Sequence, residues 1–235
     1  MKPETQSTKQ AEGWQNFYSR NRVAGRYPTE WVVRTLAGGN YPDLKMDKSR
    51  YRGARILDMG CGDGRNLPLL LDLGFEVHAT EINPEIVMLL QEMADDNGWR
   101  VNFKVGVNAS LPYPDGYFDY MLCCASCYYL EGDMTWPTVR MELARVIKPG
   151  GLMIANFCDE QNAVLKAAER HADGSLIITT DPFSIRNGSR FMAAAASEDL
   201  ALLLAPDFRL VGAGHQNDDF YGLRVSGFMT VSERL

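Results

Sequence analysis

The sequence lacks the features that mark several large classes of protein. Its 235 residues carry 24 Lys and Arg against 30 Asp and Glu, and the resulting net charge of −6 argues against a general binder of nucleic-acid phosphates. No stretch approaches the roughly 18 consecutive apolar residues of a membrane span. The opening residues, Met1–Ser7, show no apolar run of a secretory signal. We therefore expect a cytoplasmic protein without nucleic-acid or membrane partners.

Cysteine and histidine are also scarce, with five and three residues. An odd number of cysteines, three of them at Cys123, Cys124 and Cys127, favours free thiols in a reducing compartment. Cys124 and Cys127 have Cys-x-x-Cys spacing, but no second pair completes a zinc or iron–sulfur site, so we expect no metal. Hydrophobic residues form 46% of the chain and charged residues 23%, which is the composition of a folded globular protein.

Apolar runs and helical segments alternate from residue 54 onward. The runs at 55–59, 75–80, 101–105, 117–124 and 152–157 are interspersed with helical patterns at 67–73, 84–97 and 135–147. This alternation predicts βαβ units and a parallel sheet. Two later runs, at 208–213 and 225–231, have no helix between them and are expected to pair antiparallel. The predicted fold is α/β, a doubly wound, Rossmann-like sheet of seven strands with helices on both faces.

The organisation expected along the chain has three parts. Residues 1–27 precede the sheet, and residues 28–235 form a single domain with an insertion at about 158–196. Within this domain we expect helices at 29–36, at 161–170 and at 198–204, the last capped by Ser197. An extended segment is expected at 176–180.

A glycine-rich loop between the first strand and the first helix is the strongest signal. It reads Asp58-Met59-Gly60-Cys61-Gly62-Asp63-Gly64-Arg65. Glycines allow positive φ angles and close approach of a ligand to the backbone, and the helix beyond offers unpaired N–H donors. Ligands of open α/β sheets bind at the carboxyl ends of the strands. A dinucleotide fingerprint would need a glycine where Arg65 stands, so this signature is incomplete.

Two polar residues follow the next strands. Glu81 ends the second strand, where its carboxylate can accept both hydroxyls of a ribose, and Asn108 follows the third strand, where its amide can bond an adenine edge. Together with the runs Phe118–Leu122 and Glu142–Gly151, these elements stand in a specific order. In that order the chain resembles the class I S-adenosylmethionine-dependent methyltransferases of the small-molecule type, over about residues 27–157.

The resemblance implies S-adenosylmethionine as the cofactor and an antiparallel last strand in the sheet. It also implies a set of cofactor contacts: Gly60, Cys61 and Gly62 around the methionine moiety, Glu81 on the ribose diol, Ile82 packed on the adenine, Asn108 and Ala109 at the adenine edge, Asp58 near the ammonium group, and Cys124 at the methionine end. In such enzymes the amino-terminal segment often folds over the cofactor. We therefore expect Tyr18, Arg26 and Tyr27 to belong to a lid that excludes water.

The acceptor pocket is expected between this lid, the segment Cys124–Tyr129 and the loop of the final hairpin, His215–Tyr221. His215 is the predicted general base, because its ordinary pKa near ~6.5 suits proton removal at neutral pH. Tyr221 is the second catalytic candidate, and Asp218 and Asp219 share its loop. Arg186, Asn187 and Arg190 of the insertion are further acceptor-side candidates.

The predicted function is methyl transfer from S-adenosylmethionine to a small polar acceptor, chiefly by positioning for in-line displacement. The partners are then a small-molecule substrate and, at most, a second copy in a homodimer. Two alternatives stay open: a nicotinamide-dependent oxidoreductase and a non-catalytic protein that binds S-adenosylmethionine. The pair Tyr41 and Lys45 has the Tyr-x-x-x-Lys spacing of short-chain dehydrogenases, but it precedes the glycine loop instead of following it. The sequence does not choose among O-, N-, S- and C-methylation.

Overall fold

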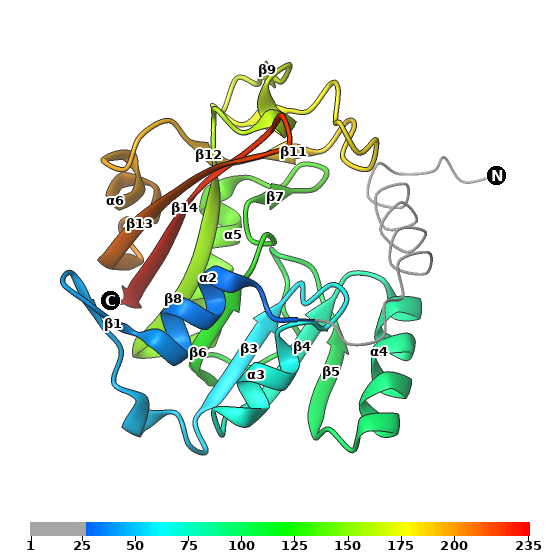
Figure 1. The fold of residues 1–235 in the computed structure, drawn as a ribbon, viewed down its shortest axis with the longest axis vertical. Coiled ribbons are helices and arrows are strands. Elements are labelled where there is room, and N and C mark those ends of the chain that lie inside the picture. Colours follow the sequence, from blue (N-terminus) through cyan, green and yellow to red (C-terminus); the bar gives the residue numbers. More distant parts are fainter. Residues whose placement is uncertain (1–26) are drawn as a thin grey trace.

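The computed structural model describes residues 27–235, so Tyr18 and Arg26 of the expected lid lie outside the described residues. The main sheet has the strand order β13-β14-β8-β6-β3-β4-β5 (Figure 1), and a short strand, β12, pairs with β8 beside this path. The bounds are β3 (Arg55–Met59), β4 (Glu76–Glu81), β5 (Val101–Val105), β6 (Phe118–Cys123), β8 (Ile147–Asp159), β12 (Ala193–Ala194), β13 (Phe208–Phe220) and β14 (Leu223–Arg234). The seven predicted strands are present, and β12 is an eighth.

The direction of the strands agrees with the prediction. Strands β5, β4, β3, β6 and β8 are parallel to one another, whereas β14 is antiparallel to both β8 and β13. The last strand is therefore the antiparallel one. It does not lie at the edge of the sheet, because it is inserted between β8 and β13.

Helices cover both faces of the sheet. Their bounds are α2 (Glu30–Val33), continued by the π-helix η1 (Arg34–Gly38), α3 (Leu67–Asp72), α4 (Pro84–Asn97), α5 (Trp136–Val146) and α6 (Asp199–Leu204). On β3, Ile56 packs in one core cluster with α2, α3 and α4, while Leu57 packs in a second cluster with α5 and α6. This alternation along a strand is the expected consequence of side chains pointing to opposite faces, and it confirms the doubly wound fold.

Local signals fix some helix boundaries and mispredict others. Asn83 caps α4 by accepting a 2.8 Å hydrogen bond from the Glu85 N–H, and Gly98 ends that helix with a φ of +67°. The expected cap at Ser197 is wrong, because Glu198 occupies the N-cap position of α6 and no side chain caps this helix. The expected helix at 161–170 is wrong as well: only the 3₁₀ turn η3 (Ala163–Leu165) forms.

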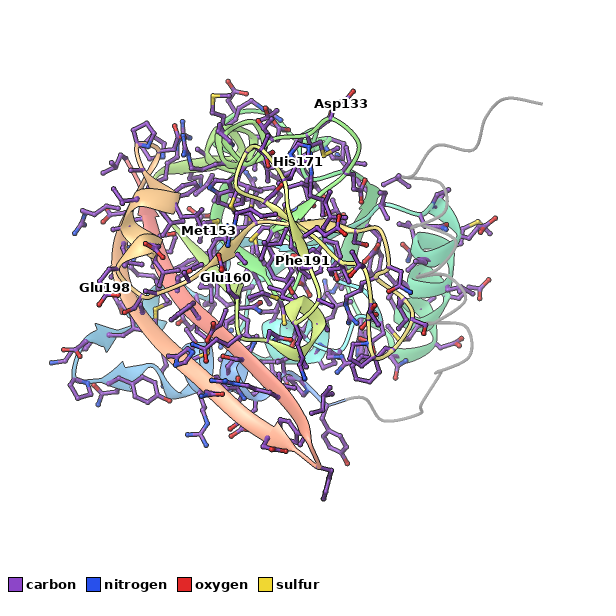
Figure 2. The ribbon with its side chains drawn as sticks, turned by 90° about the horizontal axis from the view of Figure 1, so that it is seen from above. Asp133, Met153, Glu160, His171, Phe191 and Glu198 are labelled. Carbon is purple, nitrogen blue, oxygen red and sulfur yellow. The ribbon has the colours of Figure 1, made fainter. Side chains whose placement is uncertain are left out.

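The insertion after β8 builds a second, smaller sheet together with the short strand β7 (Tyr129–Leu130), which precedes β8 in the chain. The order of this sheet is β7, β11 (Arg190–Phe191), β10 (Leu176–Ile177) and β9 (Glu169–Arg170), all antiparallel. Because β7 follows β6 directly, this sheet lies at the carboxyl edge of the main sheet, at the top of Figure 1. Figure 2, seen from above, places Phe191 of β11 near the middle of the molecule. The insertion therefore covers the edge where ligands of this fold bind.

The final hairpin is longer than predicted. Residues 215–220, expected as a loop, belong to β13 and pair with β14, so that His215 faces Phe228 and Asp218 faces Val225. Polar residues are read as a turn in the sequence, but here they form the outer part of a two-stranded ribbon. The turn itself is Tyr221 and Gly222, with φ of +55° and +89°, a pattern that suits tight hairpins.

Two remaining features complete the description. The segment that connects η1 to the main sheet contains a small hairpin and a 3₁₀ turn. The hairpin is β1 (Asn40–Tyr41) with β2 (Leu44–Lys45), and the turn is η2 (Lys48–Arg50). Within residues 27–235 no helix is both long and apolar enough to cross a membrane.

Candidate active site

A cavity of about 390 Å³ opens at the carboxyl edge of the main sheet, within the usual size range of small-molecule sites. Its walls come from the glycine loop after β3, the end of β4, the segments after β5 and β6, and the start of α2. The predicted cofactor residues that line it are Gly60, Cys61, Gly62, Glu81, Ile82, Asn108 and Cys124.

The glycine loop needs its glycines for two separate reasons. Gly60 and Gly62 both have positive φ angles, +64° and +59°, which L-residues with a Cβ rarely adopt. At Gly60 there is also no space, because an added Cβ would lie 2.8 Å from the Cβ of Ser126. The loop is thus packed against the segment after β6, and its backbone forms the cavity wall.

Replacing Gly60 with alanine is expected to lower stability and weaken ligand binding in the cavity. The left-handed backbone alone costs roughly 1–2 kcal/mol with a Cβ present, and the contact with Ser126 adds to that cost. Gly98→Ala is the matched control, since Gly98 has nearly the same φ but nothing within 4 Å of an added Cβ. Thermal unfolding and calorimetric titration compare the two. Equal losses of stability in both variants would contradict the close packing of the loop.

Glu81 is a buried carboxylate at the end of β4. Its Oε1 accepts the Gly62 N–H at 2.7 Å and its Oε2 accepts the Ile82 N–H at 3.0 Å. Burial raises the pKa of Glu81, and these two N–H donors oppose the rise. Glu81 therefore connects β4 to the glycine loop and presents its remaining acceptor positions at the cavity wall.

Asp58 is the penultimate residue of β3, just before the glycine loop, and its side chain is buried. Its side chain is 1% exposed, and neither carboxyl oxygen has a hydrogen-bond partner within residues 27–235. Burial, with the nearby charges of Glu81 and Asp63, raises the pKa of Asp58 to about 8. Such an unpaired buried acid is costly in a folded protein, and it marks a place where a cationic group would be favourable.

Cys124 lines the cavity near the glycine loop, together with the start of α2. Its Sγ lies 3.5 Å from the Thr29 Oγ1, and Asn66 of the glycine-loop side accepts the Thr29 N–H at 2.9 Å. Burial raises the pKa of Cys124 to about 11, so the residue is a neutral thiol. In the part of the chain described here, no group of three or more His, Cys, Asp and Glu side chains could hold a metal ion.

Asn108 contributes differently from the expectation. Its side-chain amide donates to the carbonyls of Ser126 and Tyr129, at 2.9 and 3.0 Å. Asn108 therefore fixes the segment after β6, and its contact with an adenine edge stays a prediction. Ala109, the other predicted adenine contact, packs against the core and does not line the cavity.

Tyr128, Tyr129 and Arg186 also line the cavity. Arg186 donates its Nε–H to the Tyr129 hydroxyl at 3.2 Å and pairs with the buried carboxylate of Asp181 at 3.2 Å. Burial raises the pKa of both tyrosines, so they are neutral phenols. A cationic guanidinium and two neutral tyrosines therefore line the same part of the cavity.

Other expected acceptor residues lie elsewhere. Tyr27, which was expected in the lid over the cofactor and not on the acceptor side, is 86% exposed and does not line the cavity. His215 contacts Asp159 at 2.8 Å and stacks on Phe228, while Tyr221 is fully exposed at the hairpin turn. Neither lines the cavity, because the hairpin is a long ribbon and not a short strand pair with a loop. The structure thus corrects their expected placement beside the acceptor pocket, and the assignment of His215 as a base stays a prediction.

The remaining candidates serve the insertion itself. Asn187 accepts the Asp181 N–H at 2.7 Å, and Arg190 donates to the carbonyl oxygens of Gly132 and Met134. The cavity residues that sequence reasoning missed include Thr29, Trp31 and Asn66. They reach the site through packing of α2 on the glycine loop, for which no motif exists.

The fold is that of a Rossmann-like protein, and the cavity lies at the carboxyl edge of its sheet, where ligands of open α/β sheets bind. Residues 56–151 match the family model of a methyltransferase domain. Two curated relatives are the 2-methyl-6-phytyl-1,4-hydroquinone methyltransferase of Synechocystis, 31% identical over 43% of this chain and 31% of the relative, and the ubiquinone biosynthesis O-methyltransferase of Maricaulis maris, 31% identical over 50% and 44%. The chain therefore spans less than half the length of these relatives.

A solved structure extends the likeness to the whole fold. The 1,6-didemethyltoxoflavin-N1-methyltransferase of Burkholderia thailandensis, determined with bound S-adenosylhomocysteine, matches with a TM-score of 0.61 and 18% identity, covering 100% of this chain and 92% of that one. Residues 56–151 thus resemble a methyltransferase domain, and the chain shares the fold of this solved methyltransferase. The nicotinamide alternative is not favoured, in agreement with Arg65 in the place of the third glycine.

Proposed function

We propose that this chain transfers a methyl group from S-adenosylmethionine to a small-molecule acceptor. The observation that carries the proposal is the arrangement of the glycine loop and Glu81 in the wall of a single cavity, with the unpaired, buried carboxyl of Asp58 on the strand that leads into this loop. Its acceptor end, at Tyr129 and Arg186, belongs to the same cavity.

The residues present fit the cofactor. An ionised carboxylate has about four acceptor positions, and Glu81 uses two of them on the N–H groups of Gly62 and Ile82, which leaves two for a ribose diol. Ile82 and Leu111 line the same wall and offer apolar surface to an adenine ring. The unpaired, buried Asp58 would take the ammonium group, and Gly60, Cys61 and Cys124 would surround the methionine moiety.

When bound, S-adenosylmethionine supplies an electrophilic methyl group on a sulfonium whose leaving group is already activated. The chain's own residues then need to orient an acceptor and exclude water, effects that can contribute about 7–11 kcal/mol. Cys124 is a neutral thiol and the two tyrosines are neutral phenols, so none of them is charged to act as a base. Arg186 would orient an acceptor that carries a negative or hydroxyl group.

The class of acceptor is suggested by the names of the relatives and by the charge of the chain. The names of two relatives point to methylation of a hydroquinone and to O-methylation in ubiquinone biosynthesis, so we extend the proposal to acceptors whose polar part bears a hydroxyl. A small molecule fits better than a nucleic acid, whose phosphates would meet a chain of net charge −6. A monomer or homodimer in the cytoplasm stays our prediction; the five cysteines without a disulfide suit a reducing compartment.

The test of the proposal is product formation. Incubation with S-adenosylmethionine and a cellular metabolite extract is expected to release S-adenosylhomocysteine, measured by mass spectrometry, together with an acceptor heavier by one methyl group. Tight binding without product would favour a non-catalytic binding protein. Binding of NAD in place of S-adenosylmethionine would favour the oxidoreductase and end the proposal.

A further inference from the structure

A second, smaller cavity of about 150 Å³ adjoins the acceptor end of the first. Tyr128 and Arg186 belong to the walls of both. The small cavity lies between the insertion and the outer part of the final hairpin, and the turn of that hairpin reaches the insertion at the top of Figure 1. A molecule at the acceptor end therefore has a place into which it can extend.

Most of the side chains that form this second cavity are apolar. They are Ala163, Val164, Phe183, Phe191, Leu223 and Val225. Two polar side chains of the same wall, Asn162 and Arg224, already form hydrogen bonds within the chain. Asn162 donates to the Ser226 carbonyl at 2.7 Å and accepts the Val164 N–H at 3.2 Å, and Arg224 donates to Asn217 at 2.8 Å. The cavity therefore has a lining that favours hydrocarbon.

Its outer side remains apolar up to the surface. Phe183 is 54% exposed and Val225 is 37% exposed. Phe183 stands on a well-fixed turn, because the buried carboxylate of Asp181 accepts the N–H groups of Phe183, Ile185 and Arg186 at 2.9–3.2 Å. The same turn thus sets the apolar Phe183 at the outside and the cationic Arg186 at the junction of the two cavities.

From this arrangement we infer that the methyl acceptor is amphipathic. Its polar head enters the cofactor cavity beside Arg186 and Tyr129, and an unbranched or lightly branched apolar tail lies in the second cavity between Val164, Phe183 and Val225. The inference rests on the proposed function for the identity of the head as a methyl acceptor. The tail site is a separate feature, since Val164, Phe183 and Val225 do not line the cofactor cavity.

The experiment titrates alkyl esters of 4-hydroxybenzoate, from methyl to hexyl, into the full chain with and without S-adenosylhomocysteine. Calorimetry is expected to show affinity rising about three- to fourfold per added methylene, followed by a plateau once the small cavity is full. An affinity that does not change with chain length would overturn the tail site.

Matched variants separate the tail site from non-specific binding. Val225→Lys places a charge in the wall of the second cavity, at the position that pairs with Asp218 across the hairpin. It is expected to abolish the dependence of ester affinity on alkyl chain length. Val211→Lys is the control, because Val211 is a similarly exposed valine of the same hairpin that lines neither cavity. Val164→Asp, on a different element, should act like Val225→Lys. An unchanged length dependence in both cavity variants would also overturn the inference.

The cofactor readout keeps the two proposals distinguishable. Val225→Lys and Val164→Asp are expected to bind S-adenosylhomocysteine as the unaltered chain does, because neither side chain reaches the cofactor cavity. If the cofactor binds but ester affinity does not depend on alkyl chain length, only the inference of an amphipathic acceptor is refuted. Absence of cofactor binding in the unaltered chain would end the proposed function, while the ester titration without cofactor would still measure the tail site.

Discussion

Glu81→Ala is expected to raise the Kd for S-adenosylmethionine by about one to two orders of magnitude. Hydrogen bonds to a charged group contribute about 1.5–3 kcal/mol each before losses, and the two acceptor positions left on Glu81 would serve the ribose hydroxyls. The substitution also removes the acceptor for the Gly62 and Ile82 N–H groups. Part of the loss therefore comes from the glycine loop itself.

Two companion variants separate these contributions. Glu81→Gln keeps one carbonyl acceptor and the shape of the side chain, so it should lose less affinity than alanine. Glu85→Ala removes an exposed carboxylate four residues further along and should leave the Kd unchanged. Isothermal titration measures all three. A Kd for Glu81→Ala within twofold of the unaltered chain would refute the ribose assignment.

Cofactor affinity is expected to increase with pH between 5.5 and 7.5, and Asp58 is the cause. Its pKa of about 8 means that the carboxyl is largely protonated at neutral pH without a ligand. An ammonium group beside it favours the ionised form, so binding must release a proton. Affinity then rises by up to about tenfold per pH unit below this pKa.

The same residue links pH to stability with a definite sign. The pKa of Asp58 is raised in the folded chain, so between its ordinary pKa near ~4 and about 8 the folded state holds a proton that the unfolded state has lost. The free energy of unfolding therefore falls as pH rises through this window. Asp58→Asn has no such proton. We therefore expect the difference in melting temperature between this variant and the unaltered chain, both without ligand, to shift in favour of the variant from pH 5 to pH 8.

Calorimetry in two buffers of different ionisation enthalpy measures the proton release directly. The unaltered chain should release close to one proton per bound cofactor at pH 6.5, and Asp58→Asn should release none from this position and bind more weakly at pH 7.5. The raised pKa of Glu81 gives a second source of pH dependence, which would remain in Asp58→Asn. Equal proton release by both proteins would rule out Asp58 as the linked group.

Sequence patterns predicted those parts of the molecule whose structure is determined locally. The helix from Pro84 to Asn97 carries its own start and end, with Asn83 as a cap and Gly98 in a left-handed conformation. The glycine loop and Glu81 were found because short-range backbone requirements leave a clear pattern. Sequence patterns also predicted the order of strands and helices, since apolar runs alternate with helical segments.

Contacts between distant segments were not predictable in the same way. Trp31 and Thr29 join the cavity only because α2 packs on the glycine loop. His215 looked like a loop residue because its neighbours are Gly, Gln, Asn and Asp, residues common in turns. In the folded chain their backbone groups pair with β14 instead. Pairing between strands is decided by the partner strand, and a single-strand pattern does not contain it.

The position of β14 between β8 and β13 has a consequence for synthesis. A ribosome delivers the chain from its amino end, so β3 to β8 can assemble while later residues are still being made. Strand β13 emerges next, but it has no hydrogen-bond partner in the sheet until residues 223–234 have followed it. Until then both β8 and β13 present open edges, which are sites of unwanted association between nascent chains. Completion of the sheet is thus coupled to delivery of its last strand.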